Sequence, residues 1–167
     1  MIKKIIKRIR SILRFKNNNL KLRGTLSAVV IKPDGEIKNL GIISKRCITI
    51  TGVFYLVDGL RDPENYPLDF FHDSGTGVTA EAVSDAELEN PCGEARDEGT
   101  KEEGDSANIF KTVATHTYSG TFVITEHGLF FAPAGGALWD RSVFEAINVV
   151  PGYRIKWEYL LTIDSGG

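Results

Sequence analysis

The stretch "YRIKWEYLLTI", which spans Tyr153 to Ile163, indicates the fold class of this chain. Its side chains form two alternating sets, one of Ile155, Trp157, Tyr159 and Leu161 and the other of Arg154, Lys156, Glu158 and Leu160. Because successive side chains of a β-strand point to opposite faces of a sheet, this period of two predicts a strand with one buried face. Strands of this kind are typical of antiparallel sheets.

The same alternation, interrupted by turn residues, recurs upstream of this strand. Residues 25–44, "TLSAVVIKPDGEIKNLGIIS", predict a hairpin with its turn at Pro33-Asp34-Gly35. Residues 108–132 predict two strands that break near Ser119-Gly120, and residues 65–77 predict a short strand that leads into a loop. The fold class that follows is mainly β, an antiparallel β-sandwich of the jelly-roll or Ig-like type.

Three segments depart from this pattern. The first carries apolar residues at the spacing of one helical face, namely Val53, Leu56, Val57 and Leu60. We expect a short internal helix there, ending near Gly59 and preceded by a strand at Cys47–Thr51. Residues 79–89 predict a turn or two of helix. Residues 90–107 are acidic and contain no large apolar residue, which predicts an exposed loop.

The charges of the chain are divided between two regions. The formal net charge is −2, yet residues 1–23 carry nine Lys or Arg and no Asp or Glu. Residues 24–167 therefore hold 11 basic and 22 acidic residues, a net charge of −11. This division predicts a basic N-terminal arm, residues 1–23, attached to an acidic β-sandwich body, residues 24–167, that includes the acidic loop at 90–107.

The arm has the pattern of an amphipathic helix. Its apolar residues recur at spacings of three and four, at Ile2, Ile5, Ile6, Ile9, Ile12 and Leu13. The cations that fill the remaining positions are Lys3, Lys4, Lys7, Arg8, Arg10 and Arg14. Such a pattern predicts a helix with one apolar face, ended by the run of asparagines at residues 17–19.

Three functions are compatible with an arm of this composition. A membrane-surface helix has such a basic face but usually carries interfacial Trp, and a nucleic-acid tail usually carries more stacking residues than Phe15 alone. Neither a membrane nor a nucleic acid is therefore the expected partner. We expect an assembly arm whose apolar face packs on a neighbouring subunit, with its own body as the alternative, while its cations meet acidic surface. The residues assigned to this contact are Ile2, Ile5, Ile6, Ile9, Lys3, Lys7, Arg8 and Arg10.

The motif Asp73-Ser74-Gly75-Thr76-Gly77 is compatible with three kinds of loop. In an aspartic protease it would present a catalytic carboxylate, which needs a second carboxylate beside it. A second Asp-Ser-Gly occurs at residues 164–166, but a chain end of this kind is a poor support for a dyad. A phosphate-binding loop would need a Lys after the glycines, where Val78 and Thr79 follow. A structural turn is the remaining interpretation.

The histidines and cysteines do not form a recognisable motif. His116 and His127 could face each other across a hairpin and hold a metal, but their spacing and that of His72 favour surface or cross-strand histidines. Cys47 and Cys92 are far apart and are expected to be free thiols. No residue is assigned to catalysis, to a cofactor or to a metal, and no small-molecule substrate is expected.

Two stretches resemble small virion proteins of tailed bacteriophages. One is "SGTGVTAEAVSDAELENP" at residues 74–91, and the other is the C-terminal run from residue 120 to residue 163. Within the second, the shared elements are Thr125-Glu126, Gly128-Leu129-Phe130, Gly135-Gly136, Arg141-Ser142 and Ile147-Asn148-Val149.

This resemblance implies a structural protein of the virion that is not an enzyme and is made in the cytoplasm of the bacterial host. It implies a capsid decoration or cement protein, or a head-fibre base, that binds the capsid and forms homo-oligomers. A tail, adaptor or baseplate component is the alternative within the virion. In this setting Gly75, Thr76 and Gly77 form a structural turn whose glycines permit unusual backbone angles.

A protein of another class would use the aromatic residues of the chain. Trp139, Trp157, Tyr153 and Tyr159 could form a platform for a sugar ring in a carbohydrate-binding or hydrolytic β-domain. The position of Trp157 in an alternating strand favours burial in the core instead.

Overall fold

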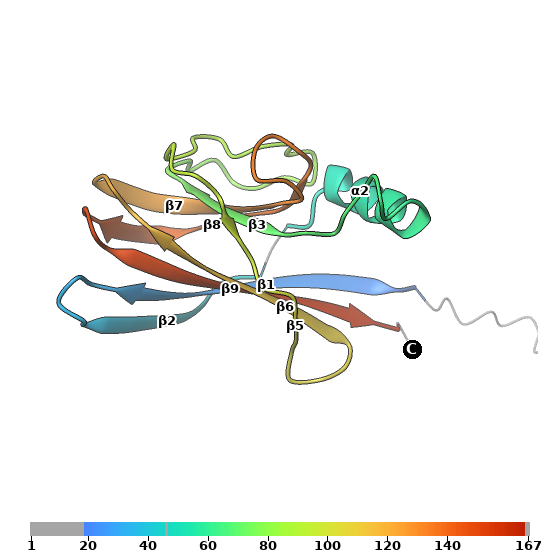
Figure 1. Cartoon of the computed structure of the whole chain (residues 1–167), viewed down its shortest axis with the longest axis horizontal. Coiled ribbons are helices and arrows are strands. Elements are labelled where there is room, and N and C mark those ends of the chain that lie inside the picture. Colours follow the sequence, from blue (N-terminus) through green and yellow to red (C-terminus); the bar gives the residue numbers. More distant parts are fainter. Residues whose placement is uncertain (1–18, 46, 166–167) are drawn as a thin grey trace, which may run out of the picture.

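A computed structural model describes residues 19–45 and 47–165, which fold into two antiparallel sheets and one helix (Figure 1). The larger sheet has the strand order β2-β1-β9-β6-β5, and the smaller has the order β4-β3-β7-β8. The elements are β1 Lys21–Ile31, β2 Ile37–Ser44, α2 Ile50–Arg61, β3 Phe71–Gly75, β4 Asp97–Glu98, β5 Glu102–Glu103, β6 Ile109–Thr117, β7 Phe122–Phe130, β8 Leu138–Val149 and β9 Arg154–Asp164. The mainly β fold class is thereby confirmed.

β9, the strand that first indicated the fold, lies in the middle of the larger sheet and pairs with both β1 and β6. The predicted inner face is confirmed: Ile155, Trp157, Tyr159 and Leu161 are all buried. Trp157 lies in register with Ala28 of β1 and Ala114 of β6. Small residues on both neighbouring strands leave room for the indole ring between the sheets.

The two sheets lie one over the other in Figure 1, and a single apolar core joins them. β1 and β9 contribute Leu26 and Trp157 to this core, while β7 and β8 contribute Leu129 and Trp139 from the other sheet. β1 and β9 each bury one face, as the alternation in the sequence predicts, whereas β7 and β8 are buried on both faces over part of their length.

The N-terminal hairpin forms as predicted. β1 and β2 pair antiparallel, and the turn between them places Gly35 at a φ of 90°, which glycine adopts without steric cost. β1 begins at Lys21, which is in register with Asp164 at the end of β9. Residues 21–23 therefore belong to the body, although their charge groups them with the basic arm. Residues 1–18, which hold every arm residue assigned to partner binding, lie outside the described residues.

The internal helix is confirmed, but it begins earlier than predicted. Thr49 is its N-cap, and the Thr49 hydroxyl accepts a hydrogen bond of 2.9 Å from the amide of Gly52. The strand predicted for Cys47–Thr51 is wrong, because Ile50 and Thr51 are helical and Ile48 forms only an isolated bridge with Asp140. A hydroxyl that satisfies a free amide at the first turn favours the helix over a strand here.

The face by which α2 contacts the sheet also differs from the pattern in the sequence. Gly52 and Gly59 are buried, whereas Val57 and Leu60 are 57% and 75% exposed. A Cβ atom on Gly52 would lie 2.7 Å from the Cα of Trp139, so the helix backbone rests directly on β8. Close approach of the two backbones thus decides the buried face, and several large apolar residues are left outside.

Two predictions for the middle of the chain are corrected. Residues 79–89 form turns and bends without helix. Their polar side chains bind nearby backbone: Asp85 accepts from the amide of Ala82, and Glu89 from the amide of Thr79. Such local bonds compete with the helical ladder. The acidic region 90–107 is not a continuous loop either, since it contains β4 and β5.

Candidate functional site

Asp73, the first residue of the Asp-Ser-Gly motif, lies in β3 and is 6% exposed. Its carboxylate accepts from the amide of Ser74 at 2.8 Å and from Nε of Arg96 at 3.1 Å. The second motif carboxylate, Asp164, lies at the end of β9 in the other sheet and pairs with Arg23. Each carboxylate has its own arginine, so within one chain the two do not form the shared-proton dyad of an aspartic protease.

The segment that follows Asp73 is held by a buried carboxylate of β7. Glu126, which is 0% exposed, accepts from the amides of Gly77 at 3.0 Å, Asn90 at 2.8 Å and Glu89 at 3.1 Å. The amide of Thr76 in turn donates to the carbonyl of Asn90 at 2.8 Å. Glu126 therefore joins the two ends of the loop formed by residues 76–90.

The predicted reason for the two glycines is wrong. Neither Gly75 nor Gly77 has a positive φ, so neither supplies an unusual backbone angle. A Cβ atom on Gly75 would lie 2.5 Å from Oε1 of Glu126, and one on Gly77 would lie 2.6 Å from the same atom. The glycines are needed because the chain passes so close to the Glu126 carboxylate.

Arg141 of β8 completes this network. Its guanidinium contacts three carboxylates, at 2.8 Å from Glu126, 2.9 Å from Asp85 and 3.4 Å from Glu89. Arg141 is only 3% exposed, and a buried charge needs such partners. Hydrogen bonds from Thr79 lower the pKa of Glu89, which keeps that carboxylate charged beside the arginine. The arrangement fixes the loop of residues 76–90 against β7 and β8.

The alternation in the sequence does not single out this network. Within their strands, Glu126 and Arg141 each lie in a run of five consecutive buried residues, so both faces of the strand are covered there. Both side chains contact the loop of residues 76–90. The available signal is that two opposite charges lie within consecutive apolar strands, where charged residues are rarely buried without a partner.

The three histidines are buried, so the surface position expected for them is wrong, and His116 does not face His127. His116 lies on β6 and His127 on β7, which belong to different sheets, so no hairpin brings them face to face. His127 Nε2 instead lies 3.0 Å from Nδ1 of His72, and Nε2 of His72 lies 3.2 Å from the Thr112 hydroxyl. His116 Nδ1 lies 2.6 Å from a carboxylate oxygen of Asp97.

Burial keeps the paired imidazoles neutral. It lowers the pKa of His72 to about 3, and burial together with the charges of His72 and His116 lowers the pKa of His127. Within residues 19–45 and 47–165, no group of three or more His, Cys, Asp or Glu is placed to hold a metal ion. The pair is a hydrogen-bonded contact inside the protein, between β3 and β7.

A second buried polar group connects the two sheets. Asp140 of β8 accepts from the Ser142 hydroxyl at 3.0 Å and from the Tyr159 hydroxyl of β9 at 3.1 Å. Nε1 of Trp139 donates to the same tyrosine oxygen at 3.1 Å. Burial raises the pKa of Asp140 to about 7, and burial with the nearby Asp140 also raises the pKa of Tyr159.

Three of the four residues considered for a sugar platform lie inside the protein, and the fourth, Tyr153, is partly buried. Trp139 and Trp157 are 0% exposed and Tyr159 is 1% exposed, so none of the three can stack on a ligand at the surface. Cys47 and Cys92 are free thiols, as predicted. In the described part of the chain, no helix has the length and apolar character needed to cross a membrane.

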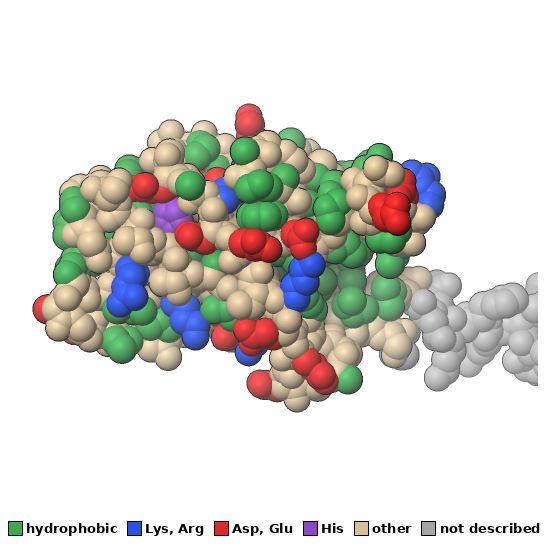
Figure 2. All heavy atoms as spheres, viewed as in Figure 1, with side chains coloured by type: hydrophobic (Ala, Val, Ile, Leu, Met, Phe, Trp, Pro, Cys, Tyr) green, Lys and Arg blue, Asp and Glu red, His purple; other side chains and the backbone are tan. Residues whose placement is uncertain are grey.

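The surface of α2 is apolar where a soluble helix is usually polar. Ile50, Phe54, Val57 and Leu60 are 47%, 66%, 57% and 75% exposed, and we call these four residues the α2 face. Spacings of three and four place them on one side of the helix. Contiguous exposed apolar side chains commonly mark an interaction site. Figure 2 shows acidic side chains scattered over the viewed side of the body, with fewer basic ones among them.

No protein-family model matches this chain, and no curated protein matches it either.

Proposed function

We propose that this protein is a structural component of a tailed-bacteriophage virion. Its role is that of a capsid decoration or cement protein, or a head-fibre base, that binds the capsid lattice and stabilises it. The resemblance of residues 74–91 and 120–163 to small virion proteins motivates the proposal. In this proposal the two sheets form a β-sandwich of the jelly-roll or Ig-like type.

The observation that carries the proposal is the contrast between the interior and the α2 face. The groups suited to chemistry, such as Asp73, His72 and Asp140, are buried and bonded to neighbouring side chains. The α2 face instead presents large apolar side chains to solvent. A protein that binds other proteins needs such a surface, because apolar area removed from water supplies much of the free energy of association.

The charge division supports a role in assembly. The body has a net charge of −11 over residues 24–167, and the first 23 residues carry nine cations. Opposite charges on two parts of one chain favour contacts between copies, which supports a homo-oligomer, and contacts with other virion proteins. The cations of the arm, among them Lys3, Lys7, Arg8 and Arg10, supply the basic part of that contact.

A tail, adaptor or baseplate component would use the same surfaces, and the location of the protein in purified heads and tails distinguishes this alternative. A carbohydrate-binding domain is disfavoured by the buried tryptophans. A hydrolytic domain predicts an activity that Asp73→Asn would abolish, and we expect no peptidase or glycosidase activity from the unaltered protein.

The test is binding to virions that lack this protein. Phe54→Asp places a charge in the centre of the α2 face, and Val123→Asp, on β7, is a matched control because Val123 is also about half exposed, at 50%. We expect Phe54→Asp to lower occupancy on the particle by at least about tenfold, since about 1.4 kcal/mol of lost apolar contact produces that change. Val123→Asp should bind like the unaltered protein.

The proposal fails if the unaltered protein does not bind such particles. Equal occupancy for Phe54→Asp and Val123→Asp would leave binding intact but would show that the α2 face is not the surface used.

A further inference from the structure

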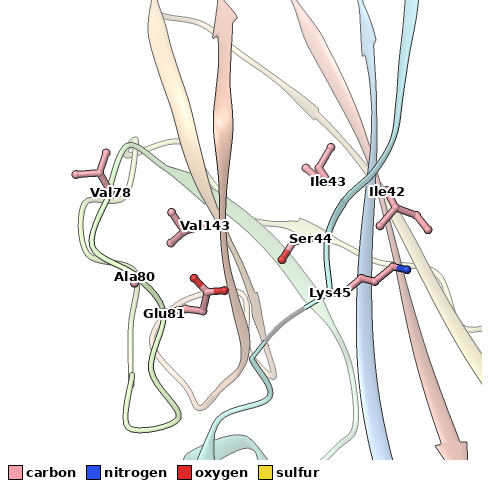
Figure 3. Close-up of a pocket in the computed structure, with 8 residues that line it drawn as sticks. All are labelled: Ile42, Ile43, Ser44, Lys45, Val78, Ala80, Glu81 and Val143. Carbon is pink, nitrogen blue, oxygen red and sulfur yellow. The ribbon is translucent and has the colours of Figure 1, made fainter.

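Two adjoining cavities form a groove beside β2, on the side where the two sheets end. The first has a volume of about 590 Å³ and lies between β2, the segment at residues 78–81 and Val143 of β8 (Figure 3). The second, of about 340 Å³, lies between the start of β1 and Ile48. Lys45 lines both cavities, so the groove runs from β2 to the point where the chain enters the body.

The walls of this groove are aliphatic and exposed. Ile42 and Val78 in the first cavity are 56% and 72% exposed, and Val83 in the second is 54% exposed. Three branched side chains around a concave surface lose contact with water at once when another aliphatic surface covers them. These walls are therefore suited to contact with aliphatic side chains.

The groove also contains polar groups. The Ser44 hydroxyl is buried, at 7% exposure, and has no hydrogen-bond partner among the described residues. Figure 3 shows Ser44 and Glu81 on opposite sides of the first cavity, while Lys45 extends away from Glu81. Glu81 belongs to the segment 79–89, which contains four acidic residues and no Lys or Arg. An occupant that carries both aliphatic and cationic side chains fits this lining.

We propose that the groove binds the apolar face of the N-terminal segment of the same chain, residues 2–13. Ile2, Ile5, Ile6 and Ile9 would pack on the aliphatic walls, and a flanking cation would meet the acidic side at Glu81. The remaining cations stay outward, where they are available to an acidic partner. This inference stands without the virion role, because it concerns a contact within one chain.

The place where the segment joins the body favours its own groove over that of another copy. β1 begins at Lys21, and Leu22 and Arg23 already line the second cavity. Leu20, which directly precedes the strand, is 65% exposed. A short connection of this kind gives the segment an effective concentration of the order of mM at the groove. Arg23 and Lys45 are cations at the margin of the groove. Because like charges repel, the cations of residues 2–13 must lie away from these two side chains.

Cys47 provides a natural reporter of the groove. It lines the second cavity and is partly buried, whereas Cys92, which contacts Ser74, lies elsewhere. The experiment measures the rate at which N-ethylmaleimide modifies each cysteine in the full chain, resolved by peptide mass spectrometry. A docked segment slows the modification of Cys47, and Cys92 is the internal control.

Ile9→Asp places a carboxylate in the middle of the apolar face, and Ser11→Asp places the same charge on the opposite face of the expected helix. We expect Ile9→Asp to raise the Cys47 rate by about tenfold, because a linked segment at mM concentration with a dissociation constant near 0.1 mM covers the groove about nine-tenths of the time. Ser11→Asp should leave the Cys47 rate unchanged, and both variants should leave the Cys92 rate unchanged.

Val83→Asp places a carboxylate in the wall of the groove. It should raise the rate at which Cys47 is modified and leave the Cys92 rate unchanged. Val123→Asp should change neither rate. Equal Cys47 rates in the unaltered protein, Ile9→Asp and Val83→Asp would overturn the proposal. Protection of Cys47 that grows with protein concentration would also overturn it and would assign the occupant to a second copy. The cysteine-modification experiment contains no virion particles, so a negative result in it does not test the proposed virion function.

Discussion

Nε of Arg141 lies 2.8 Å from a carboxylate oxygen of Glu126, and the two side chains are 3% and 0% exposed. The same carboxylate accepts from the amides of Gly77, Glu89 and Asn90. This buried pair therefore joins β7 and β8 to the loop of residues 76–90. The pair explains why this loop has a defined conformation without helix.

We expect Glu126→Ala to destabilise the protein by about 3–5 kcal/mol, because it leaves a buried arginine with weaker partners and three amides without an acceptor. Urea unfolding at pH 7 measures the change. Glu36→Ala is the matched control, since Glu36 pairs with Lys32 in a contact where both side chains are partly exposed, at 57% and 34%. An exposed pair contributes about 1 kcal/mol or less. Similar losses for both variants would contradict the role of Glu126.

The buried histidine pair predicts loss of stability in acid. The pKa of His72 is lowered to about 3 in the folded protein, from 6.5, so the unfolded chain binds its proton first as the pH falls. The free energy of unfolding should decrease below about pH 6.5, by about 1.4 kcal/mol per pH unit for each histidine. His127→Gln should reduce this slope, as measured by urea unfolding between pH 7 and pH 4. An unchanged slope would show that the pair does not resist protonation.

The raised pKa of Asp140 predicts that the free energy of unfolding changes with pH in the opposite direction. Its pKa is raised to about 7 in the folded protein, from 3.8, so the folded state holds a proton that the unfolded chain releases. Its contribution is present below about pH 4 and is lost as the pH rises through 7. Relative to the unaltered protein, Asp140→Asn should gain up to about 1.4 kcal/mol per pH unit across this range. A constant difference between the two proteins would disprove the raised pKa.

The close approach of Gly75 to Glu126 predicts a steric penalty. Gly75→Ala places a Cβ atom 2.5 Å from both Oε1 of Glu126 and the carbonyl oxygen of Asn90. We expect a loss of about 1–3 kcal/mol, the usual range for overpacking, in thermal unfolding. Gly120→Ala is the control, because its Cβ atom meets only the ring of Phe122, which can move. It should change stability by about 0.5 kcal/mol or less.

The strands and the hairpin could be predicted from the sequence because their signals are local. The alternation around Trp157 predicts the buried face of β9 without knowledge of the neighbouring strands. The turn at Pro33-Asp34-Gly35 is likewise predicted from those three residues. The same holds for the existence of α2, since its apolar spacing and the hydroxyl of Thr49 lie within a few residues.

Tertiary structure decided which residues meet. His72 and His127 are 55 positions apart and touch only because β3 pairs with β7, while His116, the other histidine that could have faced His127, lies in the other sheet. The buried face of α2 depends on the backbone of Trp139, which leaves Val57 outside. Local periodicity describes which side of an element is apolar, but contact depends on the order of strands and on backbone distance. Those are properties of the whole fold.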